Sequence, residues 1–442
     1  MIIVGNGLLI TLGGQNRVIP GGAVVIDGKL IAEVGDTPVL REKYPQARFI
    51  DAEGKVIMPG MTNTHMHLYS TFARGMALKD EPPGDFAQIL ERLWWRLDKV
   101  LGMEDVYYSA LVPLIDCVKN GTTTIVDHHA SPNAITGSLS TIARAAGEIG
   151  VRSCLCYEVS DRDGMDKAQE GIDENVRFIE ACRNEGDDML TGCMGLHASL
   201  TLSDATLQAA AAAAEKLGAG CHIHTAEGIQ DVEDSMRKSG VRVVERLQRF
   251  GILGPRSIAA HCVHVNDREI AILKETGTNV VHNPESNMGN AVGCAPVMRM
   301  LGQGVRVGMG TDGFTTDMFE GIKVANVLHK FHQADPSAAW AEVPQMIFGN
   351  NPAILSGFFP GKLGVLEPGA YADLLIVDYD PPTPLDEMNY YGHVLFGFSG
   401  GQVETTIING KVLMLNRVLQ TVDEKAVRAR ARELARKLWE RF

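Results

Sequence analysis

Residues 56–67 read VIMPGMTNTHMH, an apolar strand candidate that ends in two histidines two positions apart. On a strand, the side chains of His65 and His67 point to the same side. Seven further short runs follow, rich in Val, Ile or Thr and most of them succeeded by a helical segment: TTTIVDHH (122–129), VRSCLCYEV (151–159), LTGCMGLHAS (190–199), GCHIHTAE (220–227), SIAAHCVHV (257–265), NVVHNPE (279–285) and VRVGMGTDG (305–313). Eight parallel strand–helix units predict a closed (β/α)8 barrel, an α/β fold, over residues 57–360.

Strand-rich segments flank this middle region. Residues 2–52 and 362–414 contain short β-prone runs broken by glycine-containing turns. We expect residues 1–56 and 361–442 to form one smaller β-sandwich domain from both chain ends. The last 20 residues predict an amphipathic helix that packs on the surface.

The composition argues against several classes of partner. Of the 442 residues, 45% are hydrophobic and 21% charged, and the formal net charge is -13. An acidic surface repels phosphate backbones and anionic lipids, so neither a nucleic-acid nor a membrane partner is expected. Eight cysteines show no CxxC spacing, and the first basic residue is Arg17, which predicts a cytoplasmic protein with reduced cysteines and no signal peptide. Large barrels often dimerise, so we expect a homo-oligomer, a dimer.

Histidines and carboxylates gather at the C-terminal ends of the predicted strands, where barrel enzymes hold their active sites. His65 and His67 close strand one, His224 closes strand five and Asp312 closes strand eight. Three imidazoles and one carboxylate suit one divalent metal ion, with Zn²⁺ preferred and Fe²⁺ the alternative.

Further polar and aromatic residues near these strand ends are candidates for catalysis and substrate binding. Glu227 follows His224 by three residues, and His261 closes strand six. Aromatic and amide groups together suit a flat ring with a polar edge. The candidates for substrate contact, for several of which a structural role is the alternative, are Trp94, Trp95, His128, His129, His282, Asn283 and Asn287.

At these residues the chain resembles the amidohydrolase superfamily, in its branch of cytosine deaminase, guanine deaminase and triazine hydrolases. The resemblance covers nearly the whole chain. The matching segments, on strands one, five, six, seven and eight, are PGMTNTHMH (59–67), HIHTAE (222–227), AAHCVHV (259–265), HNPESNMGN (282–290) and MGTDG (309–313). The wording DHHASP (127–132) and LCYEVSDRDG (155–164) further resembles SsnA-type aminohydrolases, a subgroup linked to purine catabolism.

The resemblance implies a mechanism. In it, Asp312 ligates the metal and accepts a proton from the attacking water, Glu227 carries a proton to the ring nitrogen, and His261 orients the hydroxide. Binuclear members carry a carboxylated lysine on strand four, but this strand has none, which implies a single metal ion. His197 stands on that strand, where relatives often contact substrate.

The leading expectation is an aminohydrolase that converts a purine-like amino-substituted N-heterocycle to the oxo compound and ammonia. One alternative is a cyclic amidohydrolase that opens the ring of a purine-derived heterocycle. Dechlorination of a triazine is disfavoured because chloride leaves without the proton that Glu227 supplies. A non-catalytic barrel is disfavoured because all four ligands are present. The heterocycle itself is set by loops and stays open.

Overall fold

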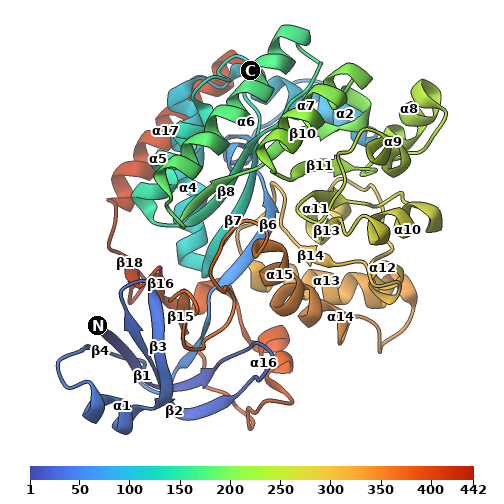
Figure 1. Ribbon diagram of the computed structural model, residues 1–442. Coiled ribbons are helices and arrows are strands. Elements are labelled where there is room, and N and C mark those ends of the chain that lie inside the picture. The colour runs from blue at the N-terminus through green and yellow to red at the C-terminus, as the bar shows by residue number, and fades with distance from the viewer.

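A barrel of parallel strands forms the larger part of the molecule in the computed structural model, which describes residues 1–442 (Figure 1). Two sheets make its wall, with strand orders β6-β7-β8-β9 and β10-β11-β12-β13-β14. Parallel bridges join Val159 to Leu196 and Met66 to Asp312, so the two sheets close on each other. The barrel strands are β6 (Met61–Met66), β7 (Thr122–His129), β8 (Arg152–Tyr157), β9 (Leu190–Gly192), β10 (Met194–Ala198), β11 (Cys221–Thr225), β12 (Ile258–His261), β13 (Asn279–His282) and β14 (Val307–Met309).

The fourth barrel strand is divided into β9, which pairs with β8, and β10, which pairs with β11. Gly195 allows β10 to lie close to the preceding strand, because a Cβ atom at this position would meet the Tyr157 carbonyl oxygen at 2.2 Å. With β9 and β10 counted as one, the eight strands of the predicted (β/α)8 barrel are all present, and the predicted fold is confirmed.

Helices cover the outside of the barrel and follow the strands in chain order (Figure 1). The helix that follows the last barrel strand, β14, is α13. The main covering helices are α4 (Met103–Asn120), α5 (Ser138–Ile149), α6 (Met165–Glu185), α7 (Asp204–Leu217), α8 (Ile229–Ser239), α9 (Val243–Arg249), α10 (Asp267–Glu275), α11 (Pro284–Gly289), α12 (Val297–Gly302) and α13 (Met318–Gln333). No helix combines the length and apolar character that crossing a membrane requires.

Both chain ends contribute to a second β structure beside the barrel (Figure 1). The antiparallel pairing of β5 with β15 joins the two ends, and Ile57 lies opposite Ile376 in that register. Its strands are β1 (Ile2–Ile10), β2 (Val18–Asp27), β3 (Leu30–Asp36), β4 (Arg48–Asp51), β5 (Val56–Pro59), β15 (Leu374–Val377), β16 (Val403–Ile408), β17 (Lys411–Leu415) and β18 (Val418–Leu419). The predicted sandwich domain from both ends is present, and its boundaries stay predictions.

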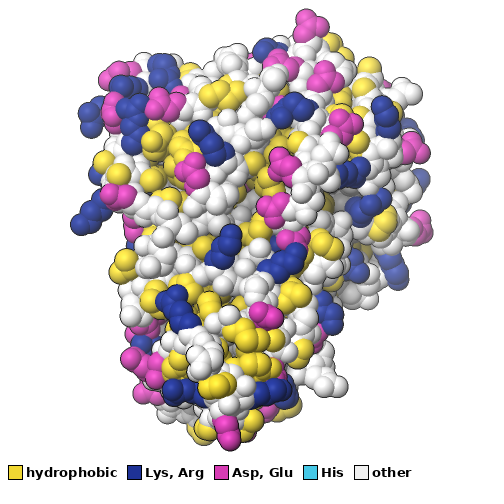
Figure 2. Space-filling view, turned by 60° about the vertical axis from the view of Figure 1, so that its left-hand side comes forward, with side chains coloured by type: hydrophobic (Ala, Val, Ile, Leu, Met, Phe, Trp, Pro, Cys, Tyr) yellow, Lys and Arg dark blue, Asp and Glu magenta, His cyan; other side chains and the backbone are white.

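The C-terminal helix α17 (Glu424–Arg441) lies against the barrel helix α4 and not on the strands that precede it (Figure 1). Arg441 pairs with the carboxylate of Asp105 at 2.6 Å, and Arg428 pairs with Asp116 at 2.6 Å. On the face in Figure 2, basic and acidic side chains alternate without an extended basic stripe.

Candidate active site

The four predicted metal ligands converge at the C-terminal mouth of the barrel. His67 Nε2 lies 3.1 Å from His224 Nε2 and 3.0 Å from Asp312 Oδ1. His65 Nε2 lies 3.7 Å from the same carboxylate oxygen. All three histidines are buried. Strands one, five and eight therefore bring the predicted ligand set together.

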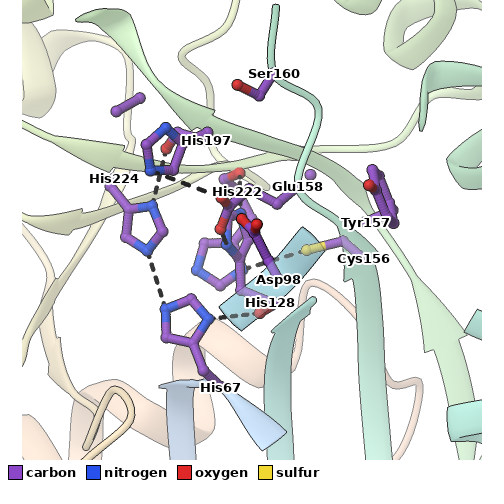
Figure 3. A network of polar contacts seen from close by, with 12 residues as sticks. His67, Asp98, His128, Cys156, Tyr157, Glu158, Ser160, His197, His222 and His224 are labelled. Carbon is purple, nitrogen blue, oxygen red and sulfur yellow. Dashed lines mark hydrogen bonds and ion pairs between the residues drawn. The ribbon is translucent and has the colours of Figure 1, made fainter. Parts of the chain in front are cut away.

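Hydrogen bonds at the far side of the rings prepare these imidazoles for a metal ion. His67 Nδ1 donates to the carbonyl oxygen of His128 at 2.5 Å, and His224 Nδ1 donates to that of His197 at 2.9 Å (Figure 3). Because a carbonyl only accepts, each Nε2 keeps a lone pair that faces the common centre. His65 Nε2 is buried without any hydrogen-bond partner. Three imidazole nitrogens and a carboxylate fit a divalent ion such as zinc.

Glu227 and His261 lie beside this centre. His261 Nε2 is 3.6 Å from Glu227 Oε2 and 3.9 Å from Asp312 Oδ2. His261 Nδ1 bonds to the side-chain oxygen of Asn287 at 2.8 Å, and the Ser286 hydroxyl donates to Asp312 Oδ2. Burial, the largest cause, raises the pKa of Glu227 to about 7. A carboxyl with that pKa can hold or release a proton near neutral pH.

Four residues at these strand ends adopt left-handed backbone conformations although none is glycine. The φ angles are +71° at His261, +49° at Cys262, +55° at Asp312 and +47° at Ala226. Such conformations cost about 1–3 kcal/mol each and cluster at functional sites, where the surrounding structure holds them. His261 and Asp312 are themselves residues of the site, and Ala226 directly precedes Glu227.

A cavity opens over the centre. Tyr69, Phe86, Trp94, Trp95 and Phe314 supply aromatic surface to its wall. The other lining groups include four carboxylates besides Asp312 and no lysine or arginine: Asp98, Glu158, Glu227 and Asp231. The cavity therefore offers flat apolar surfaces and hydrogen-bond acceptors, and neither lysine nor arginine for a phosphate group.

Of the residues predicted to contact substrate, Trp94, Trp95 and His197 line the cavity. The other five lie behind the lining. Asn283 and Asn287 contact the His261 ring. His282 Nε2 lies 3.2 Å from His329 Nε2. His129 contacts Ser131, and His128 contacts Glu158. These five residues therefore contact other residues in or near the site and do not form part of the cavity surface.

A polar network beside the centre (Figure 3) includes three residues that the sequence did not predict as site residues: Asp98, Glu158 and Arg162. Glu158 Oε2 lies 3.2 Å from His128 Nδ1, and Oε1 lies 3.6 Å from His197 Nε2. Arg162 Nη2 joins Glu158 at 3.6 Å to Asp98 at 2.9 Å. Burial raises the pKa of Asp98 to about 6. Burial also opposes ionisation of Glu158, but the charges of His197, His128 and Arg162 outweigh it and lower its pKa. Glu158 directly follows the third barrel strand in the sequence, and this place indicates a side chain at the mouth of the barrel.

The chain matches known proteins over almost its full length. The model of the amidohydrolase family matches residues 56–413, and one of an imidazolonepropionase-like composite domain of bacteria matches residues 22–47. The 5'-deoxyadenosine deaminase of Methanosarcina mazei is 34% identical and covers 99% of this chain and 98% of its own. The 5-methylthioadenosine/S-adenosylhomocysteine deaminase of Syntrophomonas wolfei is 33% identical, with 99% of each chain covered.

Solved structures show the same architecture. An adenosine deaminase from Xanthomonas campestris with bound zinc superposes with a TM-score of 0.88 at 25% identity, over 99% of this chain and 98% of that chain. The guanine deaminase of E. coli shares the fold, with a TM-score of 0.80 at 19% identity over 94% and 100% of the chains. The chain therefore belongs to the amidohydrolase family and is a metal-dependent hydrolase of non-peptide carbon–nitrogen bonds, an aminohydrolase that acts on an N-heterocycle.

Proposed function

We propose that this aminohydrolase deaminates an adenine-type purine in an unphosphorylated nucleoside and belongs to purine catabolism. The observation that carries the proposal is the cavity lining, in which aromatic walls and carboxylates surround Glu227 without lysine or arginine. Aromatic faces suit a purine ring, and carboxylates accept hydrogen bonds from amino and hydroxyl groups. The deaminase relatives named for 5'-deoxyadenosine and 5-methylthioadenosine support the same class of substrate.

We propose that His65, His67, His224 and Asp312 hold a single divalent ion, zinc in preference to iron. The buried, unpartnered His65 Nε2 supports the set. When bound, the ion supplies an activated water for attack at neutral pH. Strand four has no lysine that could hold a second ion, and the zinc-bound adenosine deaminase of the same fold supports zinc.

The residues around the ion then divide the proton transfers. Asp312 accepts a proton from the attacking water, and the Ser286 hydroxyl holds its second oxygen in place. Glu227, with a pKa near 7, delivers a proton to the ring nitrogen next to the attacked carbon, so that negative charge does not accumulate there. Because Nδ1 of His261 bonds to the Asn287 oxygen, Nε2 faces Glu227 and Asp312 and orients the attacking oxygen.

A substrate panel with the zinc-loaded protein tests the function. We expect ammonia release from adenosine, 5'-deoxyadenosine and 5-methylthioadenosine, with ultraviolet absorbance shifted but retained. Adenosine monophosphate should be a poor substrate, because its charged phosphate would face the carboxylates of the cavity. Loss of absorbance without ammonia on the best substrate would instead favour the opening of a cyclic amide ring. A preference for the monophosphate would contradict the proposed substrate class.

We also propose a cytoplasmic homodimer. All eight cysteines are free and seven are buried, which suits a reducing compartment. Light scattering of the purified protein measures the assembly state, and a monomer at micromolar concentration would contradict the dimer.

A further inference from the structure

His65 differs from the other two imidazoles of the proposed ligand set in what supports it. His67 and His224 donate to backbone carbonyls, which can only accept. His65 Nδ1 instead lies 2.8 Å from Nε2 of another imidazole, that of His222, which is fully buried on β11. Either nitrogen of this pair can carry the shared proton. If His222 carried it, the proton of a neutral His65 would sit on Nε2 and block metal binding.

A thiol at the far side of His222 decides between these two arrangements (Figure 3). Cys156 Sγ lies 3.8 Å from His222 Nδ1 and 3.4 Å from the carbonyl oxygen of Asp127. A thiol has one proton, and the carbonyl can only accept it. The contact to the carbonyl oxygen is the shorter of the two, so the thiol proton is assigned to it and the sulfur is left as an acceptor toward His222.

The roles along the chain of contacts now follow in order. His222 Nδ1 donates to the sulfur, so His222 Nε2 has a lone pair and accepts from His65 Nδ1. His65 Nε2 is then free of a proton, and this is the buried nitrogen that has no partner in the protein. We propose that His222 and Cys156 are positioning residues that fix His65 in its metal-binding tautomer. This inference rests on the proposed place of His65 in the ligand set.

The contacts from Cys156 through His222 to His65 should affect the affinity of the site for zinc. Partners that orient a metal-binding histidine typically contribute ten- to a hundred-fold in affinity. We therefore expect His222→Leu to weaken zinc binding about ten- to a hundred-fold. His222→Gln should lose less, because its amide oxygen retains an acceptor. Cys156→Ala should also weaken binding, and it is made with and without Cys193→Ala because that sulfur also neighbours His222.

Zinc affinity measured by competition with a chelator is the test, together with the melting temperatures of the zinc-free and zinc-loaded proteins. Cys117→Ala is the matched control, because this thiol is equally buried but lies in α4, outside the contacts described. A purely structural role of His222 would lower the zinc-free melting temperature and leave zinc affinity unchanged.

Wild-type affinity in His222→Leu, or an equal loss in the Cys156 and Cys117 variants, would overturn the inference. Should His222→Leu not fold, wild-type affinity in both His222→Gln and Cys156→Ala overturns it as well. His65→Ala separates this failure from that of the ligand set. If the wild type binds zinc and His65→Ala binds it equally well, the proposed ligand set is wrong.

Discussion

The environment of the Glu227 side chain differs from that of a carboxyl group in water in a way that suits proton transfer. The side chain is buried in the cavity wall, 3.6 Å from His261, and its pKa is raised to about 7. We expect Glu227→Gln to retain zinc and to lose about a hundred- to ten-thousand-fold in turnover, the usual cost of removing a proton carrier. Metal analysis and ammonia release measure the two effects.

Glu285→Gln provides a control for this variant. Its pKa is also raised to about 7 by burial, yet Glu285 does not line the cavity. Turnover should stay near the wild-type level. Unchanged turnover in Glu227→Gln would assign the proton transfer to another group, and loss of zinc would make Glu227 a ligand.

The buried carboxyl group of Asp231 should make the stability of the protein depend on pH. Its carboxylate accepts hydrogen bonds from the backbone of Ala226 and Leu200, but burial raises its pKa from 3.8 to about 7. The folded protein therefore holds a proton that the unfolded chain releases. The stabilisation that comes from this proton is complete below pH 3.8 and is lost as pH rises through 7. Between pH 5 and 8 the wild type should lose about 1–3 kcal/mol more stability than Asp231→Asn. Chemical denaturation at both pH values measures the difference, and parallel pH profiles would contradict it.

At the scale of elements, the sequence predicted which residues meet at the strand ends, because the order of the strands determines this. Parallel strands end at one mouth, so HxH, HxxE and the aspartate after β14 had to meet there. The loops over the mouth follow no such rule. Whether Trp94 or Trp95 faced the cavity, and how Asp98 and Arg162 met Glu158, depends on how residues 68–100 fold over the strand ends. The packing of α17 on α4 likewise depends on long-range pairs such as Arg441 with Asp105.

The segment of helical turns over residues 86–100 contributes both tryptophans and Asp98 to the cavity. Arg162 bonds to Asp98 Oδ2 and lies over the Trp95 ring, 5.0 Å from its centroid, while Asp98 Oδ1 is buried without a partner. We expect this free oxygen to accept a hydrogen bond from the substrate. Asp98→Asn, which weakens a charged acceptor, should raise KM about tenfold or more and leave zinc affinity unchanged.

Asp80→Asn is the control for this segment, because Asp80 pairs with Arg96 and lies outside the cavity. Its KM should match that of the wild type. If Asp98→Asn lost zinc together with activity, Asp98 would act on the metal centre and not on the substrate.

At the scale of the molecule, one buried ion pair connects the barrel to the β structure made from both chain ends. Arg152 of β8 is fully buried, and its Nε lies 3.3 Å from Oδ2 of Asp373, just before β15. The guanidinium also lies 3.9 Å from the centroid of the Tyr371 ring, and Asp373 Oδ1 accepts from the backbone of Asn409 at 2.6 Å. Both partners are therefore removed from water at the junction between the two parts of the molecule.

Removing one member of such a pair leaves a buried charge without compensation, which costs about 3–5 kcal/mol. We expect Asp373→Ala to lower the free energy of unfolding by that amount, because Arg152 remains buried. Glu367→Ala breaks the exposed pair with Lys362 in the same region and should change stability by less than about 1 kcal/mol. Changing Arg152 to Met in the Asp373→Ala protein should restore part of the loss, since it removes the uncompensated charge. Denaturation curves for the four proteins measure these differences. Equal effects of the two single alanine variants would show that the junction is held by apolar packing, and that the charge pair adds nothing to it.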